Sequence, residues 1–148
     1  MTSFSRRGFL TFAAAGAVAL GLNIPDAEAK TNVQSGFAVA GYDPVAYFDG
    51  APKRGSSEFT ATHGGATYRF VSAANRDKFV ANPARYAPQY GGYCAWAVAQ
   101  GYTAKIDPTA YSVVNGKLYL NFNRSIRSRW ENDIPGNIAA GDNNWPNL

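Results

Sequence analysis

The chain has 148 residues, 46% of them hydrophobic and 16% charged, and its formal net charge is +4. This length suffices for one domain with a modest core, and no stretch after the N-terminal region is apolar over enough residues to span a membrane. The charge excess is small. Glu131 follows Arg127 by four residues, a spacing that favours a solvated helix face over a nucleic-acid-binding patch.

Residues 1–29 have the three parts of a bacterial export signal. Arg6 and Arg7 precede the uncharged run 12–22, and a small-x-small sequence ends at Ala29. The arginine pair resembles the twin-arginine type of signal. We therefore expect cleavage after Ala29, a periplasmic location without a membrane anchor, and no contact with nucleic acid. An uncleaved anchor or a buried helix fits the short apolar run and Pro25 less well.

The remaining chain begins with a polar segment without periodicity, and we expect residues 30–36 to be a flexible lead-in to a domain over 37–148. The first predicted element is a hairpin over 58–70 that turns at Gly64 and Gly65. This turn places His63 on the apolar face of the hairpin, at its rim. The inward pairs that it predicts are Phe59 with Phe70, Ala61 with Tyr68 and His63 with Ala66.

Two helices are predicted next. Ser72 is a candidate N-cap for a helix over 72–82, and Pro83 ends it. The alanine-rich run 93–100 predicts a short helix that Gly101 caps. This second helix carries Cys94, the single cysteine of the chain.

A second hairpin is predicted over 111–121, because Asn115 and Gly116 between alternating runs favour a type I′ turn. Asn123 can then cap a helix that extends to Trp130, and the tail 138–145 is apolar enough to dock. Two hairpins alternating with short helices indicate an α+β fold. We expect the hairpins to form one small antiparallel sheet with the helices packed on one face.

Three segments together resemble the YHS domain family, in its exported single-domain branch. They are GYDPVAYF at 41–48, the set YRF at 68–70 with Phe79, Asn82, Pro83 and Tyr86, and YGGYCA at 90–95. The stretch 116–121 and Trp145 are similar as well. The resemblance covers nearly all of the chain after residue 29. It implies a small cysteine-bearing module of the kind associated with heavy-metal sensors, transporters and redox systems.

The chain departs from that pattern at the cysteines. Short members of the family have cysteines after the Asp-Pro pair and around the helix start, where this chain has Ala46, Val71, Ala74 and Asn75. The usual cysteine cluster therefore cannot form, and only Cys94 remains.

Cys94 has no partner for an internal disulfide, which leaves three interpretations. It is a buried small hydrophobic residue, a soft-metal ligand for copper or zinc, or a redox-active or intermolecularly paired thiol. His63, the single histidine, could join Cys94 as a second ligand or serve as a rim residue. Together they supply at most half of a tetrahedral zinc site, so copper(I) fits this pair better.

Other candidate pocket residues are Tyr90, Tyr93, Trp96 and Asp43. Core packing is the alternative for the aromatic residues, and the capping of a turn is the alternative for Asp43 and for Asp107.

Three functions remain open at this point. The first is an exported YHS-like binding module for a soft metal ion, copper or zinc, or for a metal-bearing periplasmic partner. The second is a non-catalytic scaffold or small-ligand carrier in which Cys94 is a core residue. The third is a thiol-dependent enzyme with Cys94 as nucleophile and His63 as base. We expect a binding module rather than an enzyme, because no third residue is marked to orient the base.

Overall fold

The structure is a computed structural model that describes residues 30–148. The expected export signal, residues 1–29, lies outside the described residues. The strands are β1 (Val33–Gln34), β2 (Phe37–Ala38), β3 (Ser56–His63), β4 (Ala66–Phe70), β5 (Asp107–Val114) and β6 (Lys117–Asn121). The α-helices are α3 (Ala73–Ala81), α4 (Pro83–Tyr86), α5 (Ala95–Gln100), α6 (Arg124–Glu131) and α7 (Ile134–Asn144). Short 3₁₀ turns are η2 (Val39–Gly41), η3 (Ala46–Asp49), η4 (Gln89–Gly92) and η5 (Trp145–Asn147).

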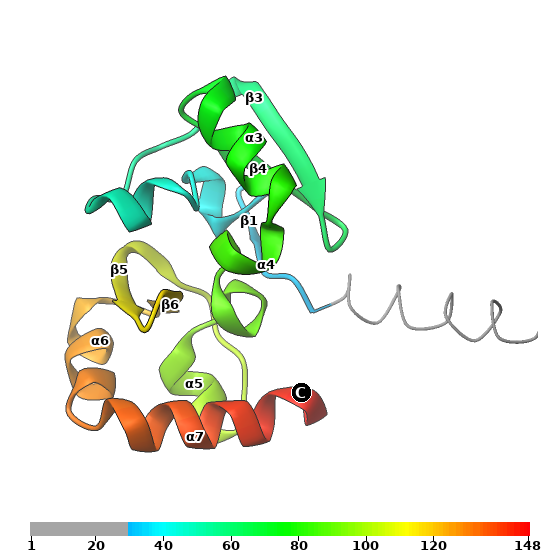
Figure 1. Cartoon of the computed structure of the whole chain (residues 1–148). Coiled ribbons are helices and arrows are strands. Elements are labelled where there is room, and N and C mark those ends of the chain that lie inside the picture. The colour runs from blue at the N-terminus through cyan, green and yellow to red at the C-terminus, as the bar shows by residue number, and fades with distance from the viewer. Residues whose placement is uncertain (1–29) are drawn as a thin grey trace, which may run out of the picture.

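The predicted α+β class is confirmed, but the hairpins do not join into one sheet. Within residues 30–148 the strands form three separate two-stranded antiparallel sheets, β1–β2, β3–β4 and β5–β6. Figure 1 shows the β3–β4 hairpin with α3 in one part of the domain, and β5–β6 with α5, α6 and α7 in the other. The two hairpins do not hydrogen-bond edge to edge; instead, side chains of both enter one core. The apolar faces drive this arrangement, because burying them removes apolar surface from water.

The register of β3–β4 is confirmed near its turn and wrong at its far end. Ala61 pairs with Tyr68, and His63 pairs with Ala66, as predicted. A register shift between Ser56 and Thr60 then pairs Phe70 with Ser56 instead of with Phe59. An irregularity of this kind inserts residues into one strand and bends it, and no turn signal reports it.

The β5–β6 hairpin has the predicted turn and register. Asn115 has φ 52° and Gly116 has φ 74°, the left-handed pair that a type I′ turn requires. Strand β6 is buried on both faces from Leu118 to Asn121. Leu118 and Leu120 enter a cluster with Phe70 and Phe79, among others, while Tyr119 enters a second cluster. The members of this second cluster are Tyr90, Ala95, Val98, Tyr119 and Trp130. Strand β6 therefore lies between two apolar clusters and contributes side chains to both.

The helix signals are largely confirmed. The hydroxyl of Ser72 accepts the backbone N–H of Asn75 at 3.1 Å, and the Asn123 side chain accepts that of Ile126 at 2.8 Å. Gly101 ends α5 with φ 97°. Pro83 ends α3, but it also occupies the first turn of the short helix α4.

The C-terminal tail docks as a longer element than predicted. Helix α7 packs along α5, and the side-chain amide of Asn144 donates to the carbonyls of Val98 (3.0 Å) and Ala99 (3.1 Å). Pro135 lies within the first turn of α7, a position that needs no backbone N–H. Pro135 therefore follows α6 and starts the next helix.

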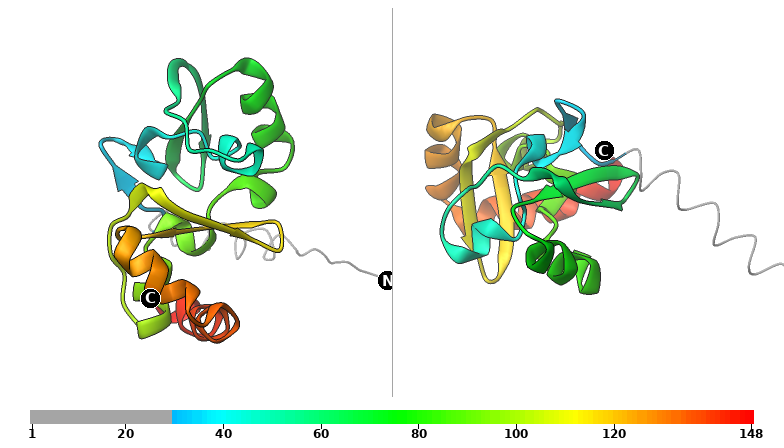
Figure 2. Two further views of the ribbon diagram at one scale, coloured as in Figure 1. Left: turned by 90° about the vertical axis from the view of Figure 1, so that its left-hand side faces the viewer. Right: turned by 90° about the horizontal axis from the view of Figure 1, so that it is seen from above.

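The expected flexible lead-in is not a lead-in, because residues 31–36 belong to the fold. Asn32 is buried and donates its backbone N–H to Gly91 at 2.8 Å and its side-chain amide to Gly92 at 3.0 Å. The Gln34 side chain both donates to and accepts from the backbone of Ile106. In both views of Figure 2 the blue N-terminal segment lies against the domain. The hydrogen-bond partners of this segment are distant in sequence, so the polar composition of residues 30–36 could not indicate that the segment is part of the fold.

None of the helices within residues 30–148 combines the length and the apolar character needed to cross a bilayer.

Candidate functional site

Cys94 lies at the start of α5, where two elements converge. Its backbone N–H donates to the carbonyl of Ala104 at 3.0 Å, and its sulfur lies 3.5 Å from the amide oxygen of Asn121 at the end of β6. The same oxygen accepts the backbone N–H of Trp96 at 2.9 Å. Asn121 therefore holds the first turn of α5 against β6, and it is completely buried.

Asn121 is a site residue that sequence reasoning missed. Its place in β6 puts it on the same face as Tyr119, but an asparagine at the end of a strand is also typical of a turn. Only the tertiary structure shows that its side chain accepts a hydrogen bond from the backbone of α5. Its amide nitrogen is buried without a hydrogen-bond partner among residues 30–148.

A cavity of about 390 Å³ opens beside Cys94. It is lined by Cys94, Trp96, Ala97, Tyr102, Ala104, Phe122, Ile126 and Arg129. Cys94 and Ala97, each 1% exposed, form its floor, whereas Tyr102 (52% exposed) and Phe122 (41%) form its rim. Large apolar side chains left this exposed around a hollow are typical of a binding site.

One charge borders this cavity. Arg129 lies on α6 with its guanidinium carbon 5.8 Å from the ring centroid of Trp96. Within residues 30–148, no acidic side chain lines the cavity. The arrangement offers an apolar interior with a single cation at its edge, which suits a molecule with an apolar body and a negative group.

His63 does not share this cavity with Cys94. It is exposed at the end of β3, and its ring centroid lies 5.7 Å from that of Phe79 and 6.4 Å from that of Tyr68. It lines two other cavities, one shared with Lys30, Gly91 and Trp145 and one shared with α3, and neither includes Cys94. The structure therefore does not bring the candidate ligand pair together in one cavity.

The donor set does not fit a metal ion held by this chain alone. Among residues 30–148, no three side chains of histidine, cysteine, aspartate or glutamate lie close enough to hold one. A thiol with one neighbouring amide oxygen is not a copper or zinc site by the usual ligand preferences.

Asp43 closes a turn, as one of its two interpretations predicts, and it does more. Its buried carboxylate accepts from the backbone N–H groups of Val45 (2.8 Å), Ala46 (3.3 Å) and Val71 (2.9 Å) and from the side chain of Asn75 (2.8 Å). The carboxylate thereby ties the 41–48 segment to the start of α3, and it is a structural group rather than a pocket residue. Asp107 caps its own turn through the N–H and hydroxyl of Thr109, both at 2.9 Å.

Tyr90 and Tyr93 pack around the C-terminus. Their ring centroids lie 6.2 Å and 6.1 Å from that of Trp145, and neither residue lines the Cys94 cavity. Burial raises the pKa of Tyr90, and the hydrogen bond that its hydroxyl donates to Asp142 at 3.0 Å raises it further. Trp96 is thus the one predicted aromatic pocket residue that joins Cys94 at the cavity.

Comparison of the chain with protein-family models, with curated proteins and with solved structures finds no match in any of the three.

Proposed function

We propose that the protein is a non-catalytic carrier that holds a small amphipathic anion in the Cys94 cavity. The observation that carries this proposal is the exposure gradient, from the enclosed floor at Cys94 to the open aromatic rim at Tyr102 and Phe122. The volume of about 390 Å³ falls in the range of small-molecule sites. Arg129 at the edge supplies the partner for a carboxylate.

The cavity supports the carrier over the two other functions. A thiol nucleophile needs a base within hydrogen-bond reach, and the neighbour of Cys94 is the amide oxygen of Asn121. For a soft metal the cavity offers Cys94 alone, so copper or zinc would have to arrive with its other ligands on a metal-bearing partner.

The YHS resemblance and the periplasmic location remain part of the proposal. What supports the resemblance is that its motif residues hold the fold together. Asp43 ties the 41–48 segment to α3, and a Cβ on Gly91 would clash with the carbonyl oxygen of Lys30. The twin-arginine pair supports export of this carrier in the folded state.

The test is a titration of the purified full chain with octanoate, followed by tryptophan fluorescence. We expect saturable binding whose signal is lost in Trp96→Phe, because Trp96 lines the cavity. Arg129→Ala should weaken octanoate about tenfold, equivalent to about 1.4 kcal/mol, and leave the neutral probe octanol unchanged.

The matched control is Arg124→Ala, which removes an arginine from the same helix but not from this cavity. The proposal fails if octanoate gives no saturable signal, or if Arg124→Ala and Arg129→Ala weaken it equally. Alkylation of Cys94 gives an independent readout, because it is the single thiol and bound octanoate should slow its modification.

A further inference from the structure

A second cavity lies on the other side of α6, and we propose that it binds the phosphate group of a small organic phosphate monoester. It has a volume of about 370 Å³ and is lined by Tyr42, Pro52, Thr109, Tyr111, Arg124 and Arg127. It shares no lining residue with the Cys94 cavity. The inference goes beyond the proposed carrier function and does not rest on it.

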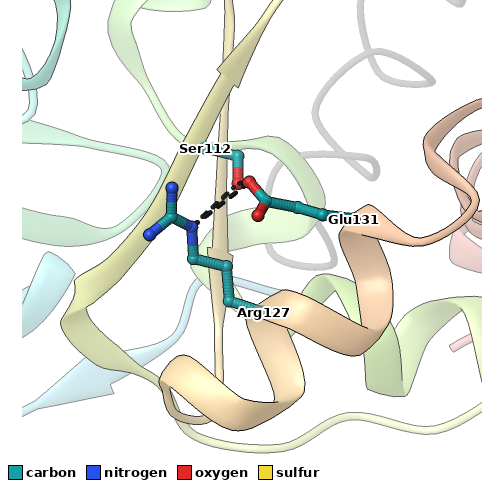
Figure 3. Close-up of polar contacts among 3 residues, drawn as sticks. All are labelled: Ser112, Arg127 and Glu131. Atoms are coloured by element: carbon teal, nitrogen blue, oxygen red, sulfur yellow. Dashed lines mark hydrogen bonds and ion pairs between the residues drawn. The ribbon is translucent and has the colours of Figure 1, made fainter.

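Arg127 is positioned for this task by its neighbours. Its Nε lies 3.3 Å from Glu131 Oε2 and 3.4 Å from the hydroxyl of Ser112, which itself donates to Glu131 at 2.7 Å. The guanidinium carbon lies 5.6 Å from the ring centroid of Tyr111. Figure 3 shows that the two terminal nitrogens point away from Ser112 and Glu131. Such a held guanidinium presents its terminal N–H groups as a fork, the geometry that binds phosphate in two places.

The charge around this cavity is unbalanced toward the positive. Arg124 is the first residue of α6, and the first turn of that helix contains no acidic residue. Cations at a helix N-terminus are unfavourable, because the backbone N–H groups there already carry positive partial charge. A bound dianion would compensate Arg124 and this end of the helix, while Arg127 is already paired with Glu131.

The carboxylates near the cavity are already engaged. Glu131 accepts from Arg127 and Ser112, and Asp107 accepts from the N–H and hydroxyl of Thr109. Arg54 does not line the cavity, and its guanidinium carbon lies 5.3 Å from the ring centroid of Tyr42. Within residues 30–148 Arg124 has no carboxylate partner, so its positive charge is available to a ligand.

The rest of the lining is Thr109, whose hydroxyl donates to Asp107, and the flat surfaces of Pro52 and of the rings of Tyr42 and Tyr111. The cavity is several times larger than a phosphate group, so a bare phosphate would leave these rings in water. An organic substituent on the phosphate would cover them.

The test is calorimetric titration of the full chain with phenyl phosphate, inorganic phosphate and acetate. We expect phenyl phosphate to bind about tenfold more tightly than inorganic phosphate, and acetate to bind more weakly than either. Arg124→Ala and Arg127→Lys should each weaken phenyl phosphate about tenfold, the second because a lysine keeps the charge and loses the fork. Arg85→Ala, which removes an exposed arginine of α4 that lines neither cavity, is the control and should bind as the unchanged chain does.

Ser112→Ala tests the positioning of Arg127 without touching the ligand. It should lower the affinity for phenyl phosphate by less than Arg127→Lys does. The proposal is overturned if phenyl phosphate does not bind, if Arg124→Ala and Arg127→Lys bind it normally, or if acetate binds as tightly as phosphate. Equal affinity for inorganic and phenyl phosphate would overturn the part of the proposal that concerns the organic group.

Discussion

The amide oxygen of Asn121 lies 3.5 Å from the sulfur of Cys94 and 2.9 Å from the backbone nitrogen of Trp96. One buried side chain at the end of β6 thus holds the first turn of α5 and the floor of the Cys94 cavity. The position of the cavity depends on a residue that does not line it.

Asn121→Ala should therefore destabilise the protein by about 1–3 kcal/mol, because the N–H of Trp96 loses its buried acceptor. The measurement is the free energy of unfolding from urea denaturation. Asn143→Ala, on the exposed side of α7, is the control and should change it by less than about 0.5 kcal/mol. Equal effects of the two substitutions would show that Asn121 does not secure α5.

Cys94→Ala should cost about 1 kcal/mol of unfolding free energy and leave metal binding unchanged. The expectation follows from the burial of Cys94 and from the single amide oxygen beside its sulfur. Titration of the full chain and the variant with copper(I) and with zinc is the measurement. Tight stoichiometric binding that disappears in Cys94→Ala would reinstate the soft-metal hypothesis.

Asp43→Asn should destabilise the domain by about 1–3 kcal/mol, because an amide in place of the carboxylate turns one acceptor into a donor that faces N–H groups. Asn75→Ala removes one of the four donors, and its effect should shrink once Asp43 is already substituted. Urea denaturation of both single variants and the double variant measures this coupling. Asp49→Asn, at an exposed position of η3, is the matched control.

Alkaline pH should destabilise the protein through its buried tyrosines. Burial raises the pKa of Tyr68 from 10.0 to about 12, and burial raises that of Tyr47 as well. These tyrosines ionise at a lower pH in the unfolded chain than in the folded one. Their contribution to the free energy of unfolding is therefore complete below pH 10 and is lost as the pH rises from 10 toward 12. The slope should reach about 1.4 kcal/mol per pH unit for each such tyrosine.

The measurement is urea denaturation at several values between pH 9 and about 11. Tyr68→Phe should make the decline shallower, because it removes one of the ionising groups and the Tyr68 hydroxyl makes no hydrogen bond within residues 30–148. Tyr102→Phe, at an exposed position, should leave the slope unchanged. A stability that stays constant up to pH 11 would contradict the burial of these hydroxyls in a neutral form.

The features predicted well from the sequence are those that a few neighbouring residues determine. Asn115 and Gly116 specify a left-handed turn, and the turn sets the register of β5–β6. Ser72 and Asn123 cap helices with their own side chains. In each case the physical cause lies within four residues of the signal, so a short window of sequence contains it.

The features that were missed depend on partners far along the chain. Asn32 bonds to residues about sixty positions away, and the separation of the two hairpins depends on how both pack into one core. The site shows the same division. Cys94 and Trp96 were identified from the sequence as a single thiol and its aromatic neighbour. Phe122 and Arg129 come to the cavity, and Asn121 to the backbone of Trp96, only through the tertiary fold.

The bonds of Asn32 also set an order of events during synthesis. This asparagine leaves the ribosome long before its acceptors at Gly91 and Gly92, and the carbonyls of Val98 and Ala99 gain their donor only when Asn144 follows, 46 and 45 residues later. Both ends of the domain thus complete their hydrogen bonds on the same middle segment, 91–99, so the domain can finish folding only after Asn144 has left the ribosome.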